Sequence, residues 1–465
     1  MQPTPQRGIP LRRIVGLALA GAALVGGLVG VFEPLGLSGA EQAALSIVLV
    51  AGVLWVTEAV PLFVTSLGVL GLALVWLVPT LERAGLAASA SHYTGPFFSD
   101  VILLFLGGFT LSAAMRKHRF DERLARAVIR LTGGRLPGLI AGVMGVTALL
   151  SMWLSNTATA AMMLAICLPL LRHLPDGHRG RRSLILSIPI GANVGGIGTP
   201  IGTPPNAIAV RYLQQQGDPI DFLQWMLAGM PLVVLLLTLG WAVLTVTTGA
   251  SRRDALDLGT DERGPRGALG WRAVLVLVVT GATVAGWVTA GWHGLSAGTV
   301  ALLPIVVLFG SGVLDTGALR GMAWDVLLLM GGGLCLGEVL QRSGLAATIV
   351  DALPLEGASA FGVLAVVCVV ACLMSTFMSN TASATLLLPL VMGLSVLDPS
   401  PLALGVAVAC SLAMALPIST PPNAIAFSSG EIRSNDLLLF GGLMSLVGLA
   451  ILVLLGPWCW SVIGI

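Results

Sequence analysis

The heptapeptide Thr-Pro-Pro-Asn-Ala-Ile-Ala (TPPNAIA) occurs twice in this chain, at residues 203–209 and again at residues 420–426. Each copy interrupts a long apolar stretch, the first at about residues 183–216 and the second at about residues 402–428. Consecutive prolines remove backbone donors and cannot continue a helix, so both stretches are expected to be broken helices. A seven-residue identity between distant segments also indicates an internal repeat.

A second motif is duplicated in the same order along the chain. Residues 151–158 read SMWLSNTA and residues 375–382 read STFMSNTA, an offset of 224 residues, compared with 217 for the first motif. An Asp-Val pair also opens an apolar run twice, at Asp100 and at Asp325. The duplications predict a first repeat, a second repeat and a polar cytoplasmic linker between them, at residues 43–248, 271–465 and 249–270 respectively.

The composition is that of a membrane protein. Of the 465 residues, 56% are hydrophobic and only 10% are charged, whereas a soluble protein has about 25% charged residues. Such a chain cannot cover a surface exposed to water, so its solvent must be lipid. The predicted fold class is an all-α polytopic membrane protein with apolar segments at about residues 14–32, 43–57, 60–80, 100–115, 137–172, 183–216, 226–248, 271–290, 296–311, 325–340, 358–391, 402–428 and 436–463.

The N-terminal segment, residues 1–42, is expected to contain a cytoplasmic N-terminus and a first transmembrane helix. Its basic residues Arg7, Arg12 and Arg13 precede the first apolar run. That run is long enough to span a bilayer, and no small-residue cleavage site follows it. We therefore interpret it as a retained helix and not as a signal peptide.

Two apolar stretches are too long for one transmembrane helix and too short for two helices with a loop. They lie at about residues 137–172 and 358–391, and each contains Ser-Asn-Thr near its middle. Each is expected to be a re-entrant helical hairpin, which enters the membrane and returns to the same side. Arginine-rich sequence flanks the first hairpin and acidic, arginine-poor sequence flanks the second. The first hairpin should therefore enter from the cytoplasm and the second from outside.

The same charge rule orients the whole chain. With the N-terminus cytoplasmic and the C-terminus external, 21 of the 24 Lys and Arg residues lie inside, and the exceptions are Arg83, Arg211 and Arg342. The repeats then have opposite topology, and inverted repeats with broken helices are typical of secondary transporters. The expected location is the inner (plasma) membrane of the cell, with an amphipathic helix at residues 116–132 along its cytoplasmic surface.

The duplicated motifs carry no basic side chain. The two Ser-Asn-Thr tips and the two Thr-Pro-Pro-Asn breaks contain no Lys, Arg or His. Four helix N-termini are expected to meet there, two from the hairpins and two from the breaks, and each offers partial positive charge and free N–H groups to an anion. A doubly charged ligand would still be under-neutralised. Na⁺ held by carbonyl, Asn and Ser oxygens would supply the balance, so the motifs predict transport of an anion coupled to a cation.

Other side chains in the apolar segments have alternative interpretations. Glu58 and Glu338 could be proton-relay groups or structural groups near a membrane surface, and the sequence leaves both alternatives open. Trp153 and Phe377, beside the tips, are interpreted as packing residues. The histidines fall in loops or at interfaces, so no catalytic constellation is expected and the chain is not expected to be an enzyme.

In these motifs the chain resembles the divalent anion:sodium symporter family, the INDY-type transporters. The resemblance rests on the paired Ser-Asn-Thr tips, the paired Thr-Pro-Pro-Asn breaks and the stretch Trp55-Val-Thr-Glu58-Ala-Val-Pro61. It covers nearly all of the chain after the first helix. It implies a homodimer in membrane lipid, in which each protomer has a scaffold domain and a transport domain that carries a small dianion in elevator fashion. No nucleic-acid partner is expected.

The resemblance also assigns residues by position. The residues implied to contact the dianion are Ser155, Asn156, Thr157, Ser379, Asn380, Thr381, Thr203, Pro204, Thr420 and Pro421. A first Na⁺ is implied near Ser151, Ser155, Asn156 and the Gly202 backbone. A second Na⁺ is implied near Ser375, the Met378 backbone, Asn380 and the Ser419 backbone. The family usually has a smaller residue in the place of Met378.

These observations favour Na⁺-coupled symport of small dicarboxylates that resemble succinate, malate or fumarate. Two alternatives in the same class stay open: sulfate or another divalent anion as the substrate, and dicarboxylate exchange without Na⁺. A channel or an intramembrane enzyme would be a different class. Inverted hairpins with broken helices favour alternating access over an open pore, and no nucleophile–base pair in the apolar segments supports an enzyme.

Overall fold

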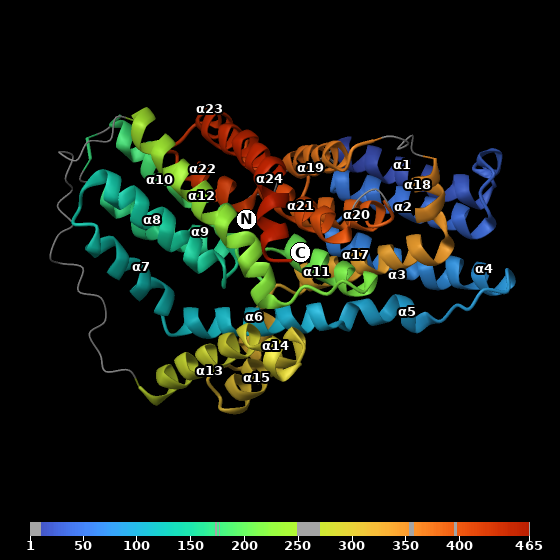
Figure 1. Ribbon diagram of the computed structural model, residues 1–465, viewed down its shortest axis with the longest axis horizontal. Helices are drawn as coiled ribbons and strands as arrows, with labels where there is room; N and C mark the ends of the chain where they lie inside the picture. Colours follow the sequence, from blue (N-terminus) through green and yellow to red (C-terminus); the bar gives the residue numbers. More distant parts are fainter. Residues whose placement is uncertain are drawn as a thin grey trace, which may run out of the picture.

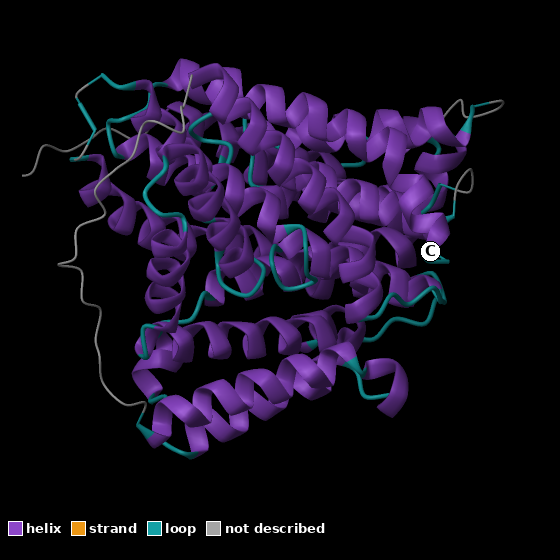
Figure 2. Ribbon diagram, turned by 60° about the vertical axis from the view of Figure 1, so that its left-hand side comes forward, coloured by secondary structure: helices purple, strands orange, loops and turns teal. Residues whose placement is uncertain are grey.

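The computed structural model describes residues 11–172, 174–175, 177–248, 270–352, 358–394 and 398–464. Within these ranges the chain forms helices and loops but no strand, and Figure 2 shows loop segments amid the helices as well as at their ends. Arg7 and residues 249–269 of the predicted linker lie outside the described residues.

The helices follow one another in three groups. The first group contains α1 (Leu11–Leu28), the 3₁₀ turn η1 (Glu33–Leu35), α2 (Gly39–Thr57), α3 (Leu62–Leu72), the π-helical turn η2 (Ala73–Leu77), α4 (Val78–Arg83), α5 (Ala90–Thr94) and the 3₁₀ turn η3 (Gly95–Phe98). The second group contains α6 (Asp100–Lys117), α7 (Phe120–Leu131), α8 (Leu136–Ser151), α9 (Asn156–Leu171), α10 (Arg179–Gly196), α11 (Pro204–Gln216) and α12 (Phe222–Thr248). The third group contains α13 (Trp271–Val288), α14 (Ala290–His293), α15 (Ala297–Gly310), α16 (Thr316–Arg320), α17 (Trp324–Ser343), α18 (Leu345–Asp351), α19 (Ala360–Phe377), α20 (Asn380–Val391), α21 (Pro399–Ser411), α22 (Pro421–Ser428), α23 (Ser434–Asp436), the π-helical turn η4 (Leu437–Gly441) and α24 (Gly442–Val462).

The helices have the lengths and composition of membrane spans. In the described part of the chain, nine helical stretches are long and apolar enough to cross a bilayer. Helices satisfy their own backbone hydrogen bonds, which lipid cannot do for them. The predicted fold class, an all-α polytopic membrane protein, is confirmed.

Each predicted hairpin is a pair of helices joined by a short turn. α8 ends at Ser151 and α9 begins at Asn156, and α19 ends at Phe377 before α20 begins at Asn380. α8 and α9 have 16 residues each and α20 has 12, so they are about 24 Å and 18 Å long at 1.5 Å per residue. The hydrocarbon core is about 30 Å thick. These three helices are therefore too short to cross it, as a re-entrant hairpin requires, whereas α19 has 18 residues and is one of the nine stretches long enough to span.

Both broken stretches are interrupted at the expected motifs. α10 ends at Gly196 and α11 begins at Pro204, while α21 ends at Ser411 and α22 begins at Pro421. Prolines occupy the start of each second helix. A helix has no internal acceptor for its first N–H groups, so proline costs nothing there. The Pro-Pro pair thus starts the second helix, while the first helix already ends upstream of it, at Gly196 and at Ser411.

The hairpins and the broken helices pack crosswise. Within each repeat, the first hairpin helix lies on the first half of the broken helix, α8 on α10 and α19 on α21. Between repeats, the second hairpin helix lies on the second half of the other broken helix, α9 on α22 and α20 on α11. A Cβ at Gly195 would clash with the Ala148 backbone, which is the close approach that small residues permit between membrane helices. Both repeats therefore share one core.

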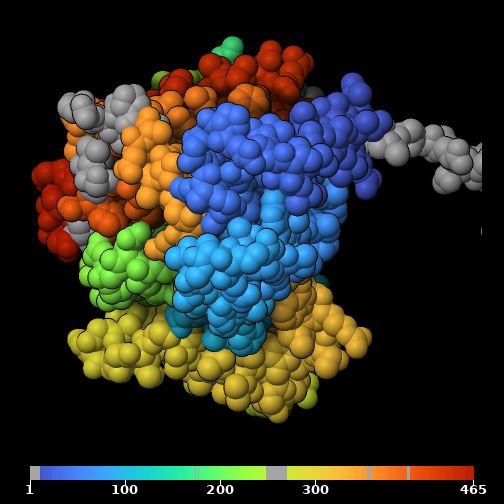
Figure 3. Space-filling model, turned by 90° about the vertical axis from the view of Figure 1, so that its right-hand side faces the viewer, coloured from blue at the N-terminus to red at the C-terminus, as the bar shows by residue number. Residues whose placement is uncertain are grey.

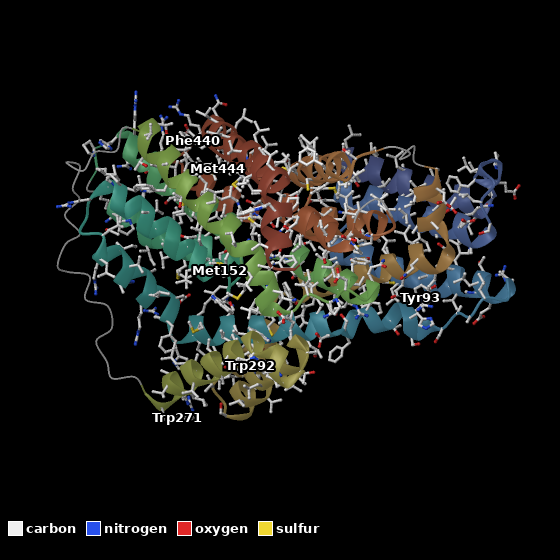
Figure 4. All side chains as sticks on the ribbon, in the orientation of Figure 1. Tyr93, Met152, Trp271, Trp292, Phe440 and Met444 are labelled. Atoms are coloured by element: carbon white, nitrogen blue, oxygen red, sulfur yellow. The ribbon has the colours of Figure 1, made fainter. Side chains whose placement is uncertain are left out.

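The other helices cover this core. α1 to α4 lie together at one end of the molecule, and α13 to α15 form a layer against α6 (Figure 1). Figure 3 shows that end of the molecule, with the N-terminal helices above and the layer around α13 to α15 below. Trp271 and Trp292 lie on that layer (Figure 4), and they are 63% and 90% exposed. Exposed tryptophans of this kind suit the interface between lipid and water.

An ion pair joins the two repeats at one end of the core. Arg181 in α10 donates from Nη2 to Glu431 Oε1 at 2.6 Å and from Nε to Oε2 at 2.9 Å. The two side chains are only 16% and 22% exposed. Hydrogen bonds from Arg181 hold the pKa of Glu431 below its ordinary value. Such a two-point contact combines charge with fixed geometry, so it should stabilise the association of the repeats.

We expect Glu431→Gln to lower the stability of the protein by about 1.5–3 kcal/mol, the usual contribution of a charged hydrogen bond. The measurement is the melting temperature of purified protein in detergent. Because the pKa of Glu431 is lowered, the stabilisation is complete above the ordinary glutamate pKa of 4.5 and is lost as the pH falls through the lowered value. The difference between wild type and variant should therefore shrink in acid.

The matched control is Asp315→Asn. This change removes the exposed Lys117–Asp315 ion pair but keeps an N-cap residue for α16. Exposed pairs contribute little, so the melting temperature should not change. Equal losses in Glu431→Gln and Asp315→Asn would contradict a special role for the link to Arg181.

Candidate functional site

Both hairpin turns and both helix breaks line one cavity of about 710 Å³. In Figure 1 the first hairpin lies to the left of centre and the second to the right. The residues that were implied to contact the dianion all line this cavity: Ser155, Asn156, Thr157, Ser379, Asn380, Thr381, Thr203, Pro204, Thr420 and Pro421. The fold therefore brings four distant segments of the sequence to one place. Their role in binding stays a prediction.

The hairpin helices begin at the cavity with unpaired N–H groups. Ser155 and Ser379 are the N-cap residues of α9 and α20, but neither of these described side chains makes a capping hydrogen bond. The first N–H groups that find an acceptor inside these helices belong to Thr159 and Ser383. The N–H groups before them point out of the helix end. An uncapped end with roughly half a positive charge suits an anionic oxygen.

Behind the second tip, three oxygen atoms share one hydroxyl proton. Ser375 Oγ lies 2.7 Å from Asn380 Oδ1 and 2.8 Å from the carbonyl oxygen of Cys410. A serine hydroxyl can donate to only one acceptor at a time. The cluster therefore keeps unused lone pairs, and neutral oxygens of this type coordinate Na⁺ in transporters with broken helices.

The first tip has the same cluster, and two glycines adjoin it. Ser151 Oγ contacts Asn156 Oδ1 and lies 2.8 Å from the carbonyl oxygen of Ala192. A Cβ at Gly196 would meet Asn156 Nδ2 at 2.9 Å and the Gly202 carbonyl oxygen at 3.3 Å. The Asn156 amide and the Gly202 carbonyl thus both lie against Gly196, where no larger residue fits without displacing them.

Some of the implied cation ligands line the cavity, and the others are buried behind the tips. Gly202, Met378 and Ser419 line the cavity together with the tip residues. Ser151 and Ser375 are fully buried behind the tips. The tip asparagines therefore have oxygen-bearing residues both in front of them and behind them. Coordination of Na⁺ by these residues stays a prediction.

The asparagines of the two breaks hold the broken backbone, a role that the sequence analysis missed. Asn206 Nδ2 donates to the carbonyl oxygens of Gly196 and Thr199 at 2.9 and 2.8 Å. Asn423 Nδ2 makes the equivalent bonds in the second break, at 2.8 and 2.9 Å. A side-chain amide has two N–H groups, and here one reaches a carbonyl at or just beyond the end of the first helix segment, that of Gly196 or Met414. The other reaches a carbonyl that also accepts a backbone N–H, Thr199 from Gly202 and Leu416 from Ser419. An amide at the same place in both copies of the motif was the signal for this role.

The breaks offer fewer free donors than the sequence analysis expected. Prolines at the start of α11 and α22 have no N–H. The next N–H is already bonded in both helices, from Asn206 to the Thr203 carbonyl and from Asn423 to Thr420 Oγ1. The expectation that all four helix ends offer free N–H groups is therefore wrong for two of them. The breaks contribute their dipoles, and the free donors come from the hairpins.

Three charged side chains line the cavity although the motifs contain no basic residue. They are Arg12 in α1, Glu58 at the end of α2 and Asp325 in α17. The motifs themselves contain no basic residue, but the cavity lining as a whole includes Arg12. Arg12 was visible in the sequence only as part of a basic N-terminal stretch, and its place beside the site depends on how α1 packs.

Glu338 already has partners of its own. Its Oε1 accepts from Gln215 Nε2 at 2.8 Å, and its Oε2 accepts from Arg342 Nε at 2.8 Å. Only 12% of the side chain is exposed. Of the two interpretations that the sequence left open for Glu338, this pairing favours the structural one.

The two aromatic residues beside the tips behave differently. Trp153 stacks on Phe222 and Trp287, with ring centroids 6.0 and 6.5 Å apart, which agrees with the packing role. Both residues line the cavity, but Phe377 is 70% exposed. The packing interpretation is therefore wrong for Phe377.

Comparison with known proteins assigns the chain to a family. A family model described as a citrate transporter matches residues 52–397 and 362–463. The chain belongs to the citrate transporter family. The sodium-dependent dicarboxylate transporter SdcS of Staphylococcus saprophyticus is 31% identical to it, over 95% of this chain and 90% of the relative.

Other relatives agree with this assignment. SdcS of Staphylococcus aureus is 31% identical over 91% of this chain and 86% of the relative. An uncharacterized transporter of Haemophilus influenzae is also 31% identical, over 92% of this chain and 93% of the relative. The resemblance to the divalent anion:sodium symporters is confirmed, and the protein is a transporter and not an enzyme.

A solved structure shares the fold of this transporter. The crystal structure of the Alcanivorax borkumensis YdaH transporter matches with a TM-score of 0.54, over 82% of this chain and 89% of that chain. The sequence identity is 16%, so the likeness concerns the fold alone.

We expect Gly196→Ala to reduce transport at least tenfold, because the added Cβ would displace the Asn156 amide. The measurement is the initial rate of uptake of a labelled dicarboxylate into cells, divided by the amount of transporter in the membrane. Gly145→Ala in α8 is the matched control, because a Cβ there meets nothing within 4 Å. An unchanged rate in Gly196→Ala would show that the close approach of Asn156 is dispensable.

Proposed function

We propose that this transporter is a Na⁺-coupled symporter of small dicarboxylates such as succinate, malate or fumarate. The observation that carries the proposal is the pair of uncapped hairpin helices that begin at one cavity, each backed by an oxygen cluster around its asparagine. The SdcS relatives are named sodium-dependent dicarboxylate transporters, which supports both the ion and the substrate class.

Two carboxylates match two helix ends. Each carboxylate would accept hydrogen bonds from the free N–H groups of one hairpin helix and from the hydroxyl groups of its Ser-Asn-Thr tip. The helix ends supply roughly half a positive charge each, so a dianion stays about one charge short. Arg12 adds one positive charge to the cavity, but Glu58 and Asp325 add two negative charges, and these do not remove the deficit.

Bound Na⁺ would remove that deficit. In the proposed arrangement one ion lies beside Asn156 and the other beside Asn380, and each also draws on the hydroxyl and carbonyl oxygens around its tip. The proposed ligands of the first ion are Ser151, Ser155, Asn156 and the Gly202 backbone. The proposed ligands of the second are Ser375, the Met378 backbone, Asn380 and the Ser419 backbone. Coupling follows because neither the dianion nor the cations alone would be neutralised in a low-dielectric site.

The proposed orientation has the N-terminus in the cytoplasm and the C-terminus outside, in the inner membrane. Arg12, Glu58 and Asp325 then lie at cytoplasmic ends of their helices, so the cavity would open to the cytoplasm. The crosswise core of hairpins and broken helices would be the moving domain of an elevator. The other helices would form the scaffold, and a homodimer would hold the scaffold fixed in the membrane.

We expect uptake of labelled succinate into proteoliposomes to require an inward Na⁺ gradient, because the site holds the dianion only together with cations. The measurement compares a Na⁺ buffer with a choline buffer at equal ionic strength. Equal uptake in both buffers would contradict symport, and acceleration by internal dicarboxylate would then favour exchange. If unlabelled sulfate competes more strongly than unlabelled malate, sulfate is the substrate. Citrate is tested as a third competitor because the family model is described as a citrate transporter.

We expect Asn156→Ala and Asn380→Ala each to lose at least 90% of uptake while the protein still reaches the membrane. Each change removes the amide oxygen on which a tip serine and the proposed cation both depend. Asn435→Ala, at an exposed position in α23 away from the cavity lining, is the control and should transport normally. Normal uptake by both tip variants would rule out the proposed site.

A further inference from the structure

Asn193 is a buried polar residue to which the proposed site gives no role. It lies in α10, is 3% exposed, and lines the cavity. Its Nδ2 donates to Thr420 Oγ1 at 3.1 Å and to Asn423 Oδ1 at 3.2 Å. Asn193 belongs to the first repeat, whereas both acceptors belong to the break of the second. Its amide therefore links the two repeats at the site.

This link runs in one direction only. The position equivalent to Asn193 in the second repeat is Ser411. Asn193 follows Ala192 and Ser411 follows Cys410, and the carbonyls of Ala192 and Cys410 accept from the serines behind the two tips, Ser151 and Ser375. Ser411 Oγ donates within its own helix, at 3.1 Å. In the first break, the atom equivalent to Asn423 Oδ1 is Asn206 Oδ1. It is buried and has no hydrogen-bond partner among the described residues. The first repeat therefore holds the second break, without the reverse contact.

Asn193 also adjoins the oxygen cluster of the first tip. The carbonyl of the preceding residue, Ala192, lies 2.8 Å from Ser151 Oγ, which contacts Asn156. A small shift of α10 at this point would therefore move both the cluster behind the first tip and the amide that holds Thr420. Thr420 is 3% exposed and lines the cavity, and its hydroxyl accepts both from the Asn423 N–H of its own break and from Asn193 of the other repeat.

We propose that Asn193 is a positioning residue that couples the two halves of the substrate site by acting through Thr420. Its amide keeps the Thr420 hydroxyl aimed at the substrate, and the Ala192–Asn193 peptide joins that hydroxyl to the cluster behind the first tip. The proposal deepens the proposed function and rests on it, because it assigns a role within the same site.

A double-mutant cycle tests whether Asn193 acts through Thr420. The variants are Asn193→Ala, Thr420→Val and the double variant, assayed for uptake of labelled succinate in proteoliposomes. We expect each single change to raise the KM about tenfold with Vmax changed less than twofold. The double variant should show the same tenfold increase, because residues that share one interaction are not additive. A hundredfold increase in the double variant would overturn the proposal, and so would an unchanged KM in Asn193→Ala.

The controls separate this inference from a structural role and from the proposed function. Ser187→Ala removes a different buried polar group from α10, a hydroxyl that bonds only within its own helix, and it should keep the wild-type KM. If Asn193→Ala does not reach the membrane, Asn193→Ser replaces it in the cycle with the same expected result. Wild-type protein without Na⁺-dependent uptake would overturn the proposed function. Active wild type with additive variants would overturn the role of Asn193 alone.

Discussion

The backbone groups exposed where two membrane helices break, ahead of each proline pair, are the constraint on which the rest of this structure depends. Lipid cannot satisfy a free carbonyl, and each one left bare would cost several kcal/mol. Asn206 and Asn423 meet this demand, because each amide donates to two carbonyls in its own break. Each break therefore satisfies these carbonyls from within its own motif, and the second break also receives hydrogen bonds from Asn193 of the first repeat.

The hairpins are arranged in the opposite way. Their helices α9 and α20 reach the cavity without side-chain caps, so their N–H groups remain available to an anion. A fixed arginine between the tips would be costly at membrane depth. Helix ends supply partial positive charge from the backbone itself, so the site can favour an anion without a fixed arginine between the tips. Arg12 reaches the cavity from α1, outside the crosswise core of hairpins and broken helices.

Much of the fold followed from local sequence. Consecutive prolines cannot lie inside a helix, and the interrupted apolar runs around Asn156 and Asn380 were too long for one span, so breaks and hairpins were predictable. The tip residues could be named from their motif, and the cavity contains all of them. The donors of the breaks were misjudged, since the N–H groups of Asn206 and Asn423 are already bonded within the motif. Phe377 was misjudged too, because its exposure depends on neighbouring segments.

The sequence by itself determined that the chain is a membrane protein and that two of its helices break. It also determined that the Ser-Asn-Thr tips occupy equivalent positions in the two repeats. These are properties of short segments: apolar length, missing N–H groups and duplicated motifs. Only the tertiary structure decided that Arg12 reaches the cavity and that Asn193 holds the second break. The physical reason is that packing decides which groups a polar side chain meets, and a hydrogen bond needs only a separation of about 3 Å. For partners more than 200 residues away along the chain, such as Asn193 and Thr420, packing alone makes that choice.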